Sequence, residues 1–335
     1  MRKNLLSVFS IIFLTSFSVV TAQSTDLEKF TSEMLVIADN FAAPGAEGAA
    51  VQSSAGWFSS ARSLDKWQVE VSVYGNALFV PKSKQNKLIT KASLGNQHPG
   101  ESNILNIQGG SNALLPTVFG GDTDVVFEGE LLGQEFSFDA IDGLNKKVII
   151  HPFPQVTVGL PYGTEVALRY VPRVVIDNVG VSTSGIGFKH NFAQYFKYSR
   201  PDDFQVAAVF TYSNIDIDYE YAPIEINASG VNVLELNRID VKADLWLLQA
   251  LASKLYGNFE VFGAMGVTSS NFDYSMGGGG SLLPRLNDEL GALGGNDVKF
   301  KADLGFNYYI GNFKISSAFT AGSFFNANLG LHYKI

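Results

Sequence analysis

Strict alternation of apolar and polar residues over long stretches is the feature that most constrains this chain. In the segment 154–172, PQVTVGLPYGTEVALRYVP, Val156 and Val158 alternate with polar residues, and a second alternating run follows a corner at 161–163. This pattern predicts a β-hairpin whose strands each have one apolar and one polar face. The apolar face meets a second sheet in a soluble sandwich and lipid in a membrane barrel.

The same period of two recurs to the end of the sequence. We expect ten strands, at 67–79, 153–160, 164–173, 181–190, 204–219, 238–254, 258–272, 298–310, 313–321 and 326–335. Several reach the ~9–11 residues of a tilted membrane strand, whereas strands of soluble proteins are usually ~5–6 residues long. Residues 82–150 are compatible with two to four further strands or with hairpins outside the membrane. Because single-chain bacterial barrels have even strand numbers, we predict a transmembrane antiparallel β-barrel of about 12–14 strands.

The expected connections fall into two kinds. Tight turns are expected at 160–164, 255–258 and 309–312, and long polar or glycine-rich loops at 222–237 and 274–297. Short turns at one end and long loops at the other are typical of transmembrane barrels, in which the short turns are periplasmic. This asymmetry favours the barrel over the sandwich.

The beginning of the chain indicates export. Residues 1–22 contain a basic start, an apolar run from Leu5 to Val20 and small residues before Gln23, which is typical of a cleaved signal peptide. The absence of cysteine excludes thiolate metal sites and thiol catalysis. A formal charge of -8 argues against a nucleic-acid partner, which normally requires a basic surface.

Between the signal peptide and the first strand we expect a plug for the lumen, called a hatch. Residues 26–41 have apolar side chains at helical spacing, and Ser24 or Thr25 can cap the helix. The following AAPGAEGAAVQSSAGWFSSA, 42–61, predicts a closely packed irregular segment. The predicted organisation is therefore a signal peptide (1–22), a hatch (23–65) and a barrel (66–335).

The last strand carries a specific signal. Leu329, Leu331, Tyr333 and Ile335 share one face, which we expect to meet outer-membrane lipid. The segment resembles the C-terminal signal by which the barrel assembly machinery recognises its substrates. Ile335 stands where that signal usually ends in an aromatic residue.

The order of these parts resembles the long-chain fatty-acid transporter family of outer-membrane barrels. This resemblance is carried by residues 26–79 and the barrel pattern, and it implies a hatch inside a barrel that passes hydrophobic compounds. Ser54-Ala55-Gly56-Trp57-Phe58 stands where the hatches of that family usually carry Asn-Pro-Ala. LPTVFGG (115–121), 154–172 and GIGFKHNFAQYF (185–196) are similar to blocks of an uncharacterised family of Bacteroidota outer-membrane barrels.

Charged residues on the polar strand faces are expected to point into the lumen, because a lysine or arginine facing lipid at the membrane midplane costs roughly 2–4 kcal/mol. With one histidine, the set is Glu70, Glu165, Arg169, Asp240, Lys242, Asp244, Glu260, Lys299, Lys301, Asp303 and His332. Both signs are present, so pairing with one another or with the hatch is expected. Such pairing is as compatible with a braced, plugged lumen as with a substrate path.

No motif indicates catalysis, a cofactor or a metal. The four histidines are far apart in the sequence and none follows a nucleophile elbow. A hydrolase would require a serine within hydrogen-bond reach of His332. Asp216, Asp218 and Glu220 are more simply a solvated acidic strand end than a calcium site. We therefore expect no enzyme.

Two functions remain as hypotheses for an outer-membrane location. The first is passive transport of a hydrophobic or amphipathic small molecule, with Phe30, Met34, Phe41 and Trp57 of the hatch along the path. Arg169 is the best candidate for a carboxylate head group, because a guanidinium binds carboxylate in a bidentate fashion. The second is a surface scaffold or receptor that binds a secreted or surface partner through 222–237 and 274–297.

Overall fold

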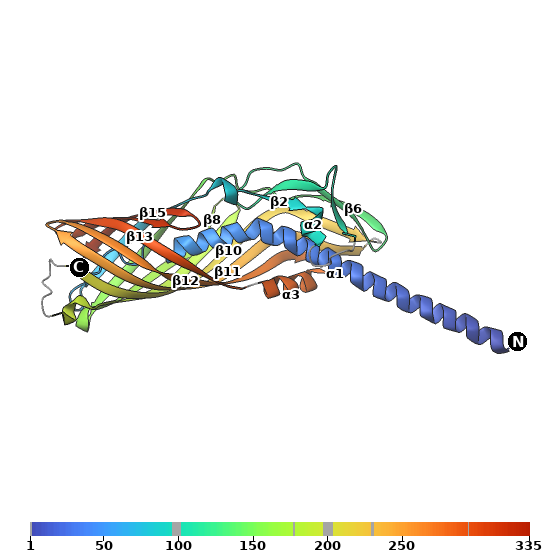
Figure 1. The fold of residues 1–335 in the computed structure, drawn as a ribbon, viewed down its shortest axis with the longest axis horizontal. Coiled ribbons are helices and arrows are strands. Elements are labelled where there is room, and N and C mark those ends of the chain that lie inside the picture. Colours follow the sequence, from blue (N-terminus) through green and yellow to red (C-terminus); the bar gives the residue numbers. More distant parts are fainter. Residues whose placement is uncertain (1, 96–101, 177, 197–203, 229–230, 294) are drawn as a thin grey trace.

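A closed barrel with a cap over one end forms the molecule (Figure 1). This computed structural model describes residues 2–95, 102–176, 178–196, 204–228, 231–293 and 295–335, with side chains from residue 26 onward except at 228, 231, 292 and 293. The predicted fold class, an antiparallel barrel with an N-terminal helical segment, is confirmed. The number of barrel strands is ten rather than 12–14.

The wall consists of the ten segments expected from alternation. They are β1 (Val69–Phe79), β7 (Val148–Leu160), β8 (Thr164–Ile176), β9 (Val179–Asn191), β10 (Gln205–Ala228), β11 (Val231–Tyr256), β12 (Phe259–Gly279), β13 (Asn296–Ile310), β14 (Phe313–Ala321) and β15 (Phe325–Lys334). From β7 to β15 each strand pairs with the next in sequence, and β1 closes the barrel between β15 and β7. Short helical turns η3 (Pro161–Gly163) and η4 (Ala193–Tyr195) follow β7 and β9.

The ambiguous region 82–150 adds no strand to the wall apart from the start of β7. Its elements are η1 (Lys82–Lys84), β2 (Asn86–Thr90), α2 (Lys91–Leu94), β3 (Leu105–Ile107), β4 (Asn112–Pro116), β5 (Val126–Leu131) and β6 (Gln134–Asp139). They form two small sheets, β2–β4 and β3–β5–β6. β1 pairs directly with β7 along its whole length, from Val69↔Val158 to Phe79↔Val148, so no further strand fits between them.

The two long loops expected at 222–237 and 274–297 are largely regular structure. β10 and β11 continue as a paired hairpin beyond the barrel, and β12 extends to Gly279 before α3 (Leu283–Leu293). Ile226, Leu234 and Leu236 are buried there against the N-terminal helix. The prediction of loops was wrong because these polar segments carry an inward apolar face that packs on protein.

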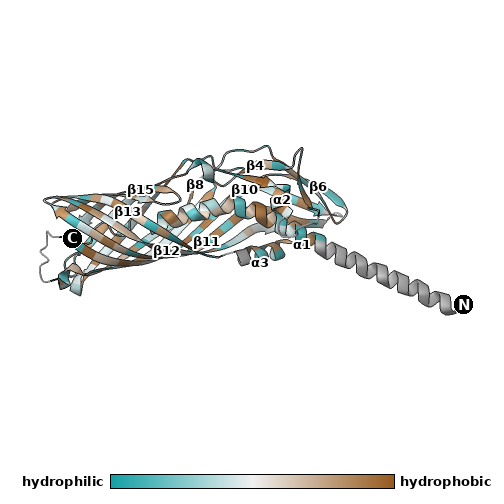
Figure 2. Ribbon diagram, in the orientation of Figure 1, coloured by the Kyte–Doolittle hydropathy of each residue, from teal (hydrophilic) through white to brown (hydrophobic). Residues whose placement is uncertain are grey.

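The barrel has the polarity of a membrane protein. Along the wall strands the colours alternate between apolar and polar (Figure 2). The outward positions are apolar, and most inward positions are polar, apart from small clusters such as Leu247 with Trp57. Aromatic side chains mark both edges of the apolar band, with Phe79, Phe319 and Phe325 at the cap end and Tyr308, Phe313 and Tyr333 at the other. Leu329, Leu331 and Ile335 of the last strand are exposed on this outer face, as predicted. An apolar exterior between two aromatic girdles identifies a membrane-spanning barrel.

The helix α1 (Arg2–Ser54) enters through the cap and runs into the lumen (Figure 1). It was expected to end at Phe41, and the extension to Ser54 corrects that expectation. Small residues make the extension possible: a Cβ at Gly45 would lie 2.7 Å from the Val118 side chain, and one at Gly48 would lie 2.8 Å from Leu78. Residues 2–22 form the far end of this helix, and their removal as a signal peptide stays a prediction. No helix in the described part of the chain is both long and apolar enough to cross a membrane.

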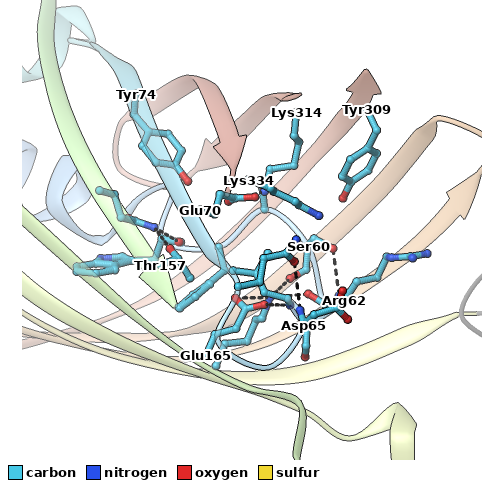
Figure 3. A pocket seen from close by; sticks show the side chains of 18 residues that line it. Ser60, Arg62, Asp65, Glu70, Tyr74, Thr157, Glu165, Tyr309, Lys314 and Lys334 are labelled. Carbon is cyan, nitrogen blue, oxygen red and sulfur yellow. Dashed lines mark hydrogen bonds and ion pairs between the residues drawn. The ribbon is translucent and has the colours of Figure 1, made fainter. Parts of the chain in front are cut away.

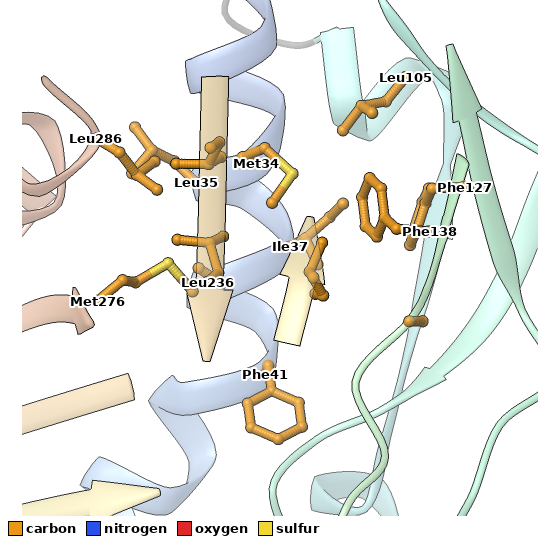
Figure 4. Packing of buried hydrophobic residues seen from close by; sticks show 14 of the residues in the cluster. Met34, Leu35, Ile37, Phe41, Leu105, Phe127, Phe138, Leu236, Met276 and Leu286 are labelled. Atoms are coloured by element: carbon orange, nitrogen blue, oxygen red, sulfur yellow. The ribbon is translucent and has the colours of Figure 1, made fainter. Parts of the chain in front are cut away.

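We call the cap the assembly of residues 26–41 of α1, residues 80–147, the ends of β10–β12 beyond the barrel, and α3. Its core side chains lie on two sides of α1, with Leu286 and Met276 on one side and Phe127 and Phe138 on the other (Figure 4). Phe30, Met34 and Phe41 are 1–4% exposed, and the Phe30 ring meets Phe136 edge-on at 5.6 Å. Three of the four expected substrate-path residues therefore lie in a closed apolar core.

Candidate functional site

The lumen is filled by the end of α1 and by residues 55–66, which we call the coil. Below Ser54 the chain has no regular structure until β1, yet Ala55, Trp57 and Ala61 are at most 2% exposed. The expectation of a closely packed irregular segment holds for this part and is wrong for 42–54. Buried backbone groups without a helix or sheet need partners elsewhere.

Arg169 of β8 supplies partners at the end of α1. Its guanidinium donates to the carbonyls of Ser53 (3.2 Å) and Ala55 (3.2 and 3.3 Å) and to the side chain of Gln155 (3.0 Å). The last carbonyls of a helix lack intrahelical donors and carry partial negative charge, so a cation is favoured there. Arg169 is 3% exposed and holds the hatch, which was one of its two predicted roles.

Other lumen side chains bind the last carbonyl of α1 and five further carbonyls of the coil. Lys301 donates to Ser54 O, Gln155 to Trp57 O, Asn307 to Ser59 O, Lys189 to Ser60 O and Arg62 O, and Asn191 to Ala61 O, all between 2.7 and 3.0 Å. Glu165 accepts from Leu64 N at 2.6 Å and Ser253 from Ala61 N at 3.1 Å. The polar wall thus replaces the hydrogen bonds that regular secondary structure would make.

Charged pairs complete this arrangement. Lys189 lies 3.0 Å from Glu165, and Lys301 lies 2.7 Å from Asp303. Glu260 accepts hydrogen bonds from Ser60, Asn307 and Tyr309. Sequence reasoning missed Lys189, Asn191 and Asn307 among the lumen residues. Asn307 continues the polar face on which Lys299, Lys301 and Asp303 were expected, whereas no lumen residue had been expected on β9.

Trp57 fixes the coil laterally. Its indole lies against β9, where a Cβ at Gly185 or Gly187 would come within 2.9 and 2.8 Å of the ring. The Arg169 guanidinium lies over the same ring at 4.2 Å and over Phe153 at 3.8 Å. The glycines of the block 185–196 therefore provide the flat surface that this tryptophan needs.

A cavity of about 170 Å³ lies below the coil, at the end of the barrel with the short turns (Figure 3). It is lined by polar groups of the wall, including Glu70, Lys314 and Lys334, and by coil residues such as Ser60 and Asp65. Lys314 pairs with Glu70 at 2.9 Å. Trp57 also borders this cavity, unlike the three proposed path residues in the cap core.

Two further cavities adjoin α1 near the rim at the cap end. They measure about 180 and 390 Å³ and share Glu47, Phe272, Asp297 and Lys299 among their lining residues. Glu47 pairs with both Lys84 and Lys299. Lys299 therefore faces inward as predicted, and here too the charges connect α1 to its surroundings.

The predicted orientation of β11 is wrong. Asp240, Lys242 and Asp244 point outward, while Val241 and Leu245 point inward and are buried. This part of the strand lies beyond Trp246, which belongs to the aromatic edge, so water surrounds its outer face. Because no lipid contacts this part of β11, packing against α1 determines that its apolar face points inward. The other predicted lumen residues, including Glu70, Glu165, Glu260 and Asp303, do face inward.

His332 lies between two serines inside the wall. Its Nε2 is 2.7 Å from Ser316 Oγ, and its Nδ1 is 2.7 Å from Ser72 Oγ and 3.2 Å from Glu70. This order matches that of a Ser-His-acid triad. However, His332 is 0% and Ser316 3% exposed, and neither lines any of the cavities described above. In this conformation the cluster connects β1, β14 and β15.

Asp216, Asp218 and Glu220 lie on the outer face of β10, where Arg173 binds Asp218 at 2.6 Å. Within the described residues no group of three potential ligands is placed to hold a metal ion.

β7 and β8 are paired over only part of their length. Their contact extends from Leu160↔Thr164 to Gln155↔Arg169. Above this point β7 pairs only with β1 and β8 only with β9, as far as Val148 and Ile176 respectively. Pro152, Pro154 and Pro172 lie on these two unpaired edges, as expected for residues without an N–H donor. We call this interruption of the wall the window.

The window begins within the apolar outer face and is closed from inside, and its upper part, at Arg173, lies beside Asp218 on the hydrated outer face of β10. Tyr170 and Ile150 beside it are 65% and 70% exposed on the outer, apolar face. Behind it Tyr74, Phe153 and Val171 form a buried cluster, with the Tyr74 and Phe153 rings stacked at 5.0 Å. Arg169 lies next to this cluster, and its Nε is the one donor of that guanidinium without a partner among the described residues.

The sequence matches the model of a family of unknown function, DUF6588, over residues 1–335. The chain belongs to this family. No curated protein matches it.

Solved structures similar to the DUF6588 chain are outer-membrane barrels. Ail of Yersinia pestis is 8% identical, with 81% of this chain and 99% of that chain covered and a TM-score of 0.27. The β-domain of the Bordetella autotransporter BrkA is 8% identical, with 80% and 99% covered and a TM-score of 0.36. OprG of Pseudomonas aeruginosa is 11% identical, with 81% and 96% covered and a TM-score of 0.27. At these values the similarity carries no argument about function.

Proposed function

We propose that this DUF6588 protein is an outer-membrane barrel that passively admits an amphipathic small molecule from the membrane through the window. The window is the observation that carries the proposal. Backbone groups that face lipid without partners cost several kcal/mol each, so open strand edges are avoided at membrane depth. Two such unpaired strand edges, those of β7 and β8, flank the window. A barrel that only had to stay closed would not need unpaired edges in its wall.

The surroundings of the window suit an amphiphile. An apolar chain arriving from the lipid would first meet Phe153, Val171 and Tyr74, which must shift to admit it. Behind them the partnerless Nε of Arg169 offers a hydrogen bond and positive charge to an acidic head group. From there the route to the cavity at the short-turn end passes the coil.

The experiment is uptake by liposomes of a fluorescent carboxylic acid with a medium-length alkyl chain. The chain has no cysteine, so Pro152→Cys with Pro172→Cys can be bridged across the window by a short bismaleimide. The matched control is Phe210→Cys with Leu248→Cys, which are direct partners on the outer face of β10 and β11. We expect bridging to stop uptake in the first variant only. Equal uptake by both bridged variants would contradict the proposal.

A surface receptor is the second candidate function, and one observation favours it. Leu88 and Leu114 face each other across the β2–β4 sheet of the cap and are 63% and 60% exposed. Such a pair suits contact with a secreted or surface partner. Replacing both with serine should abolish binding of that partner and leave uptake unchanged, whereas bridging the window should do the reverse.

A further inference from the structure

The N-terminal segment crosses the whole barrel in addition to the ten strands. Phe30 and Met34 are buried in the cap at one end. At the other end Ser63 donates to the carbonyl of Gly163 in the turn after β7, at 2.9 Å, and Trp67 N binds Gly159 O at 2.7 Å. The chain therefore travels from the cap to the short-turn end before the first strand begins.

This crossing determines where the two ends of the chain lie. Ten antiparallel strands alone would leave the start of β1 and the end of β15 on the same side of the membrane. That side is the short-turn end, because Lys334 at the end of β15 binds Asn312 in the short turn 311–312. The additional crossing by α1 and the coil makes the total odd. Asp26 and Lys334 must consequently lie on opposite sides of the membrane.

The orientation of the barrel follows from its connections. η3 and the turns at 257–258 and 311–312 are two or three residues long and lie at one end, with the longer connection 192–204. The other end has the short connections 177–178 and 322–324, but it also carries the described residues of 80–147, the ends of β10–β12 beyond the barrel, and α3. The largest connections therefore lie at the cap end. Short turns of such barrels are periplasmic and long connections are extracellular. We infer that the hatch is threaded from outside to inside, so that its N-terminal end is displayed at the cell surface within the cap.

This topology limits what can move the plug. A hatch whose N-terminal end lies on the periplasmic side can be pulled by a periplasmic partner, but the N-terminal end of this hatch, at Asp26, lies on the side of the cap. Any partner that acts on the N-terminal end of α1 must therefore approach from outside the cell. This inference does not depend on whether the barrel transports anything.

Cysteine labelling tests the topology, since each introduced cysteine is the only one in the chain. Glu28→Cys reports on the N-terminal end of α1, Leu88→Cys on the cap and Asn312→Cys on the short-turn end, and all three native residues are exposed. Intact cells producing the full-length protein are treated with a membrane-impermeant maleimide, before and after the outer membrane is permeabilised.

We expect the variants at 28 and 88 to be labelled in intact cells, and the variant at 312 only after permeabilisation. Labelling at 88 but not at 28 in intact cells would overturn the threading. Labelling at 312 but not at 88 in intact cells would show the opposite barrel orientation and would overturn the inference as well.

Discussion

The two halves of the hatch are held by different physics. In the cap, Phe30, Met34 and Phe41 are fixed by apolar burial among several elements. In the lumen, the coil is fixed by side chains that bind its carbonyls one by one, such as Asn307 on Ser59 and Lys189 on Ser60. Loss of apolar burial has no compensation, whereas water can replace a hydrogen bond at a net cost of roughly 0.5–1.5 kcal/mol. The coil, rather than the cap, is therefore the part suited to rearrange.

The largest effect is expected in the cap. Phe30→Ala should lower the free energy of unfolding by about 3–5 kcal/mol, because it removes a buried ring and leaves a cavity. Hydrogen exchange measured by mass spectrometry should show faster exchange in the cap and unchanged exchange in the coil. Leu88→Ala, at an exposed site of the same cap, is the control. Faster exchange in the coil of the Phe30 variant would break the separation between the halves.

A smaller effect is expected where the halves join. Arg169→Met should cost about 2–3 kcal/mol, since the carbonyls of Ser53 and Ala55 lose a charged donor. The coil should exchange faster, and the barrel should conduct ions more readily in a planar bilayer. Arg169→Lys should rescue little, because a lysine cannot reproduce the planar fork. Full rescue by lysine would mean that charge alone holds the coil.

Overpacking beside Trp57 should loosen the coil alone. Gly187→Val places atoms where the indole lies, which costs about 1–3 kcal/mol. A blue or red shift of tryptophan fluorescence and faster exchange at 55–61 are the expected readouts. Gly75→Val, at a site with nothing within 4 Å of the new Cβ, is the matched control on another wall strand.

A substitution of Ser316 distinguishes a structural from a catalytic role of the serines beside His332. Ser316→Ala should cost only about 1 kcal/mol, the value of one buried hydrogen bond. The wild-type protein should not react with a fluorophosphonate probe. Labelling of the wild type that Ser316→Ala abolishes would show that movement of the coil exposes a reactive serine.

The smallest effect concerns pH. Burial raises the pKa of the Asp39 carboxyl in the cap, and Lys87 offsets this by a smaller amount. Because the folded pKa is above the unfolded one, the stabilising contribution is present below the unfolded pKa and is lost as the pH rises through the folded pKa. The contribution of Asp39 to the stability of the cap should therefore grow as the pH falls toward the unfolded pKa of this carboxyl. Measured as the difference between the wild type and Asp39→Asn, it should be larger at acidic than at neutral pH, and a difference that shrinks on acidification would contradict the sign.

The sequence predicted the wall well because lipid enforces a regular rule. Each alternating segment became a wall strand, and Leu329 and Ile335 face outward as expected. The rule failed where lipid ends: on β11, beyond Trp246, the same alternation faces the opposite way because α1 supplies the apolar surroundings. The period of two alone does not show whether the apolar face of a strand meets lipid or another part of the protein.

The hatch was only half predicted for a different reason. Pro44, Gly45 and Gly48 are unfavourable in a helix, so the expected end at Phe41 followed from local propensity. The helix nevertheless continues, because the space beside Val118 and Leu78 is narrow and only small residues fit there. The partners of the coil could be listed from the polar strand faces, but which carbonyl each one binds depends on the path of an irregular segment.

Two disulfide locks test most directly whether the coil moves while the cap stays closed. Ala61→Cys with Ser253→Cys joins the coil to the wall, where Ala61 N lies 3.1 Å from the Ser253 hydroxyl. Gly45→Cys with Val118→Cys joins α1 to the cap, where a Cβ at 45 would lie 3.8 Å from that of Val118, a suitable distance for a disulfide. Uptake of the fluorescent acid is measured before and after reduction. We predict that the coil lock stops uptake until it is reduced and that the cap lock has no effect. Normal uptake with the coil locked, or loss of uptake with only the cap locked, would contradict the account.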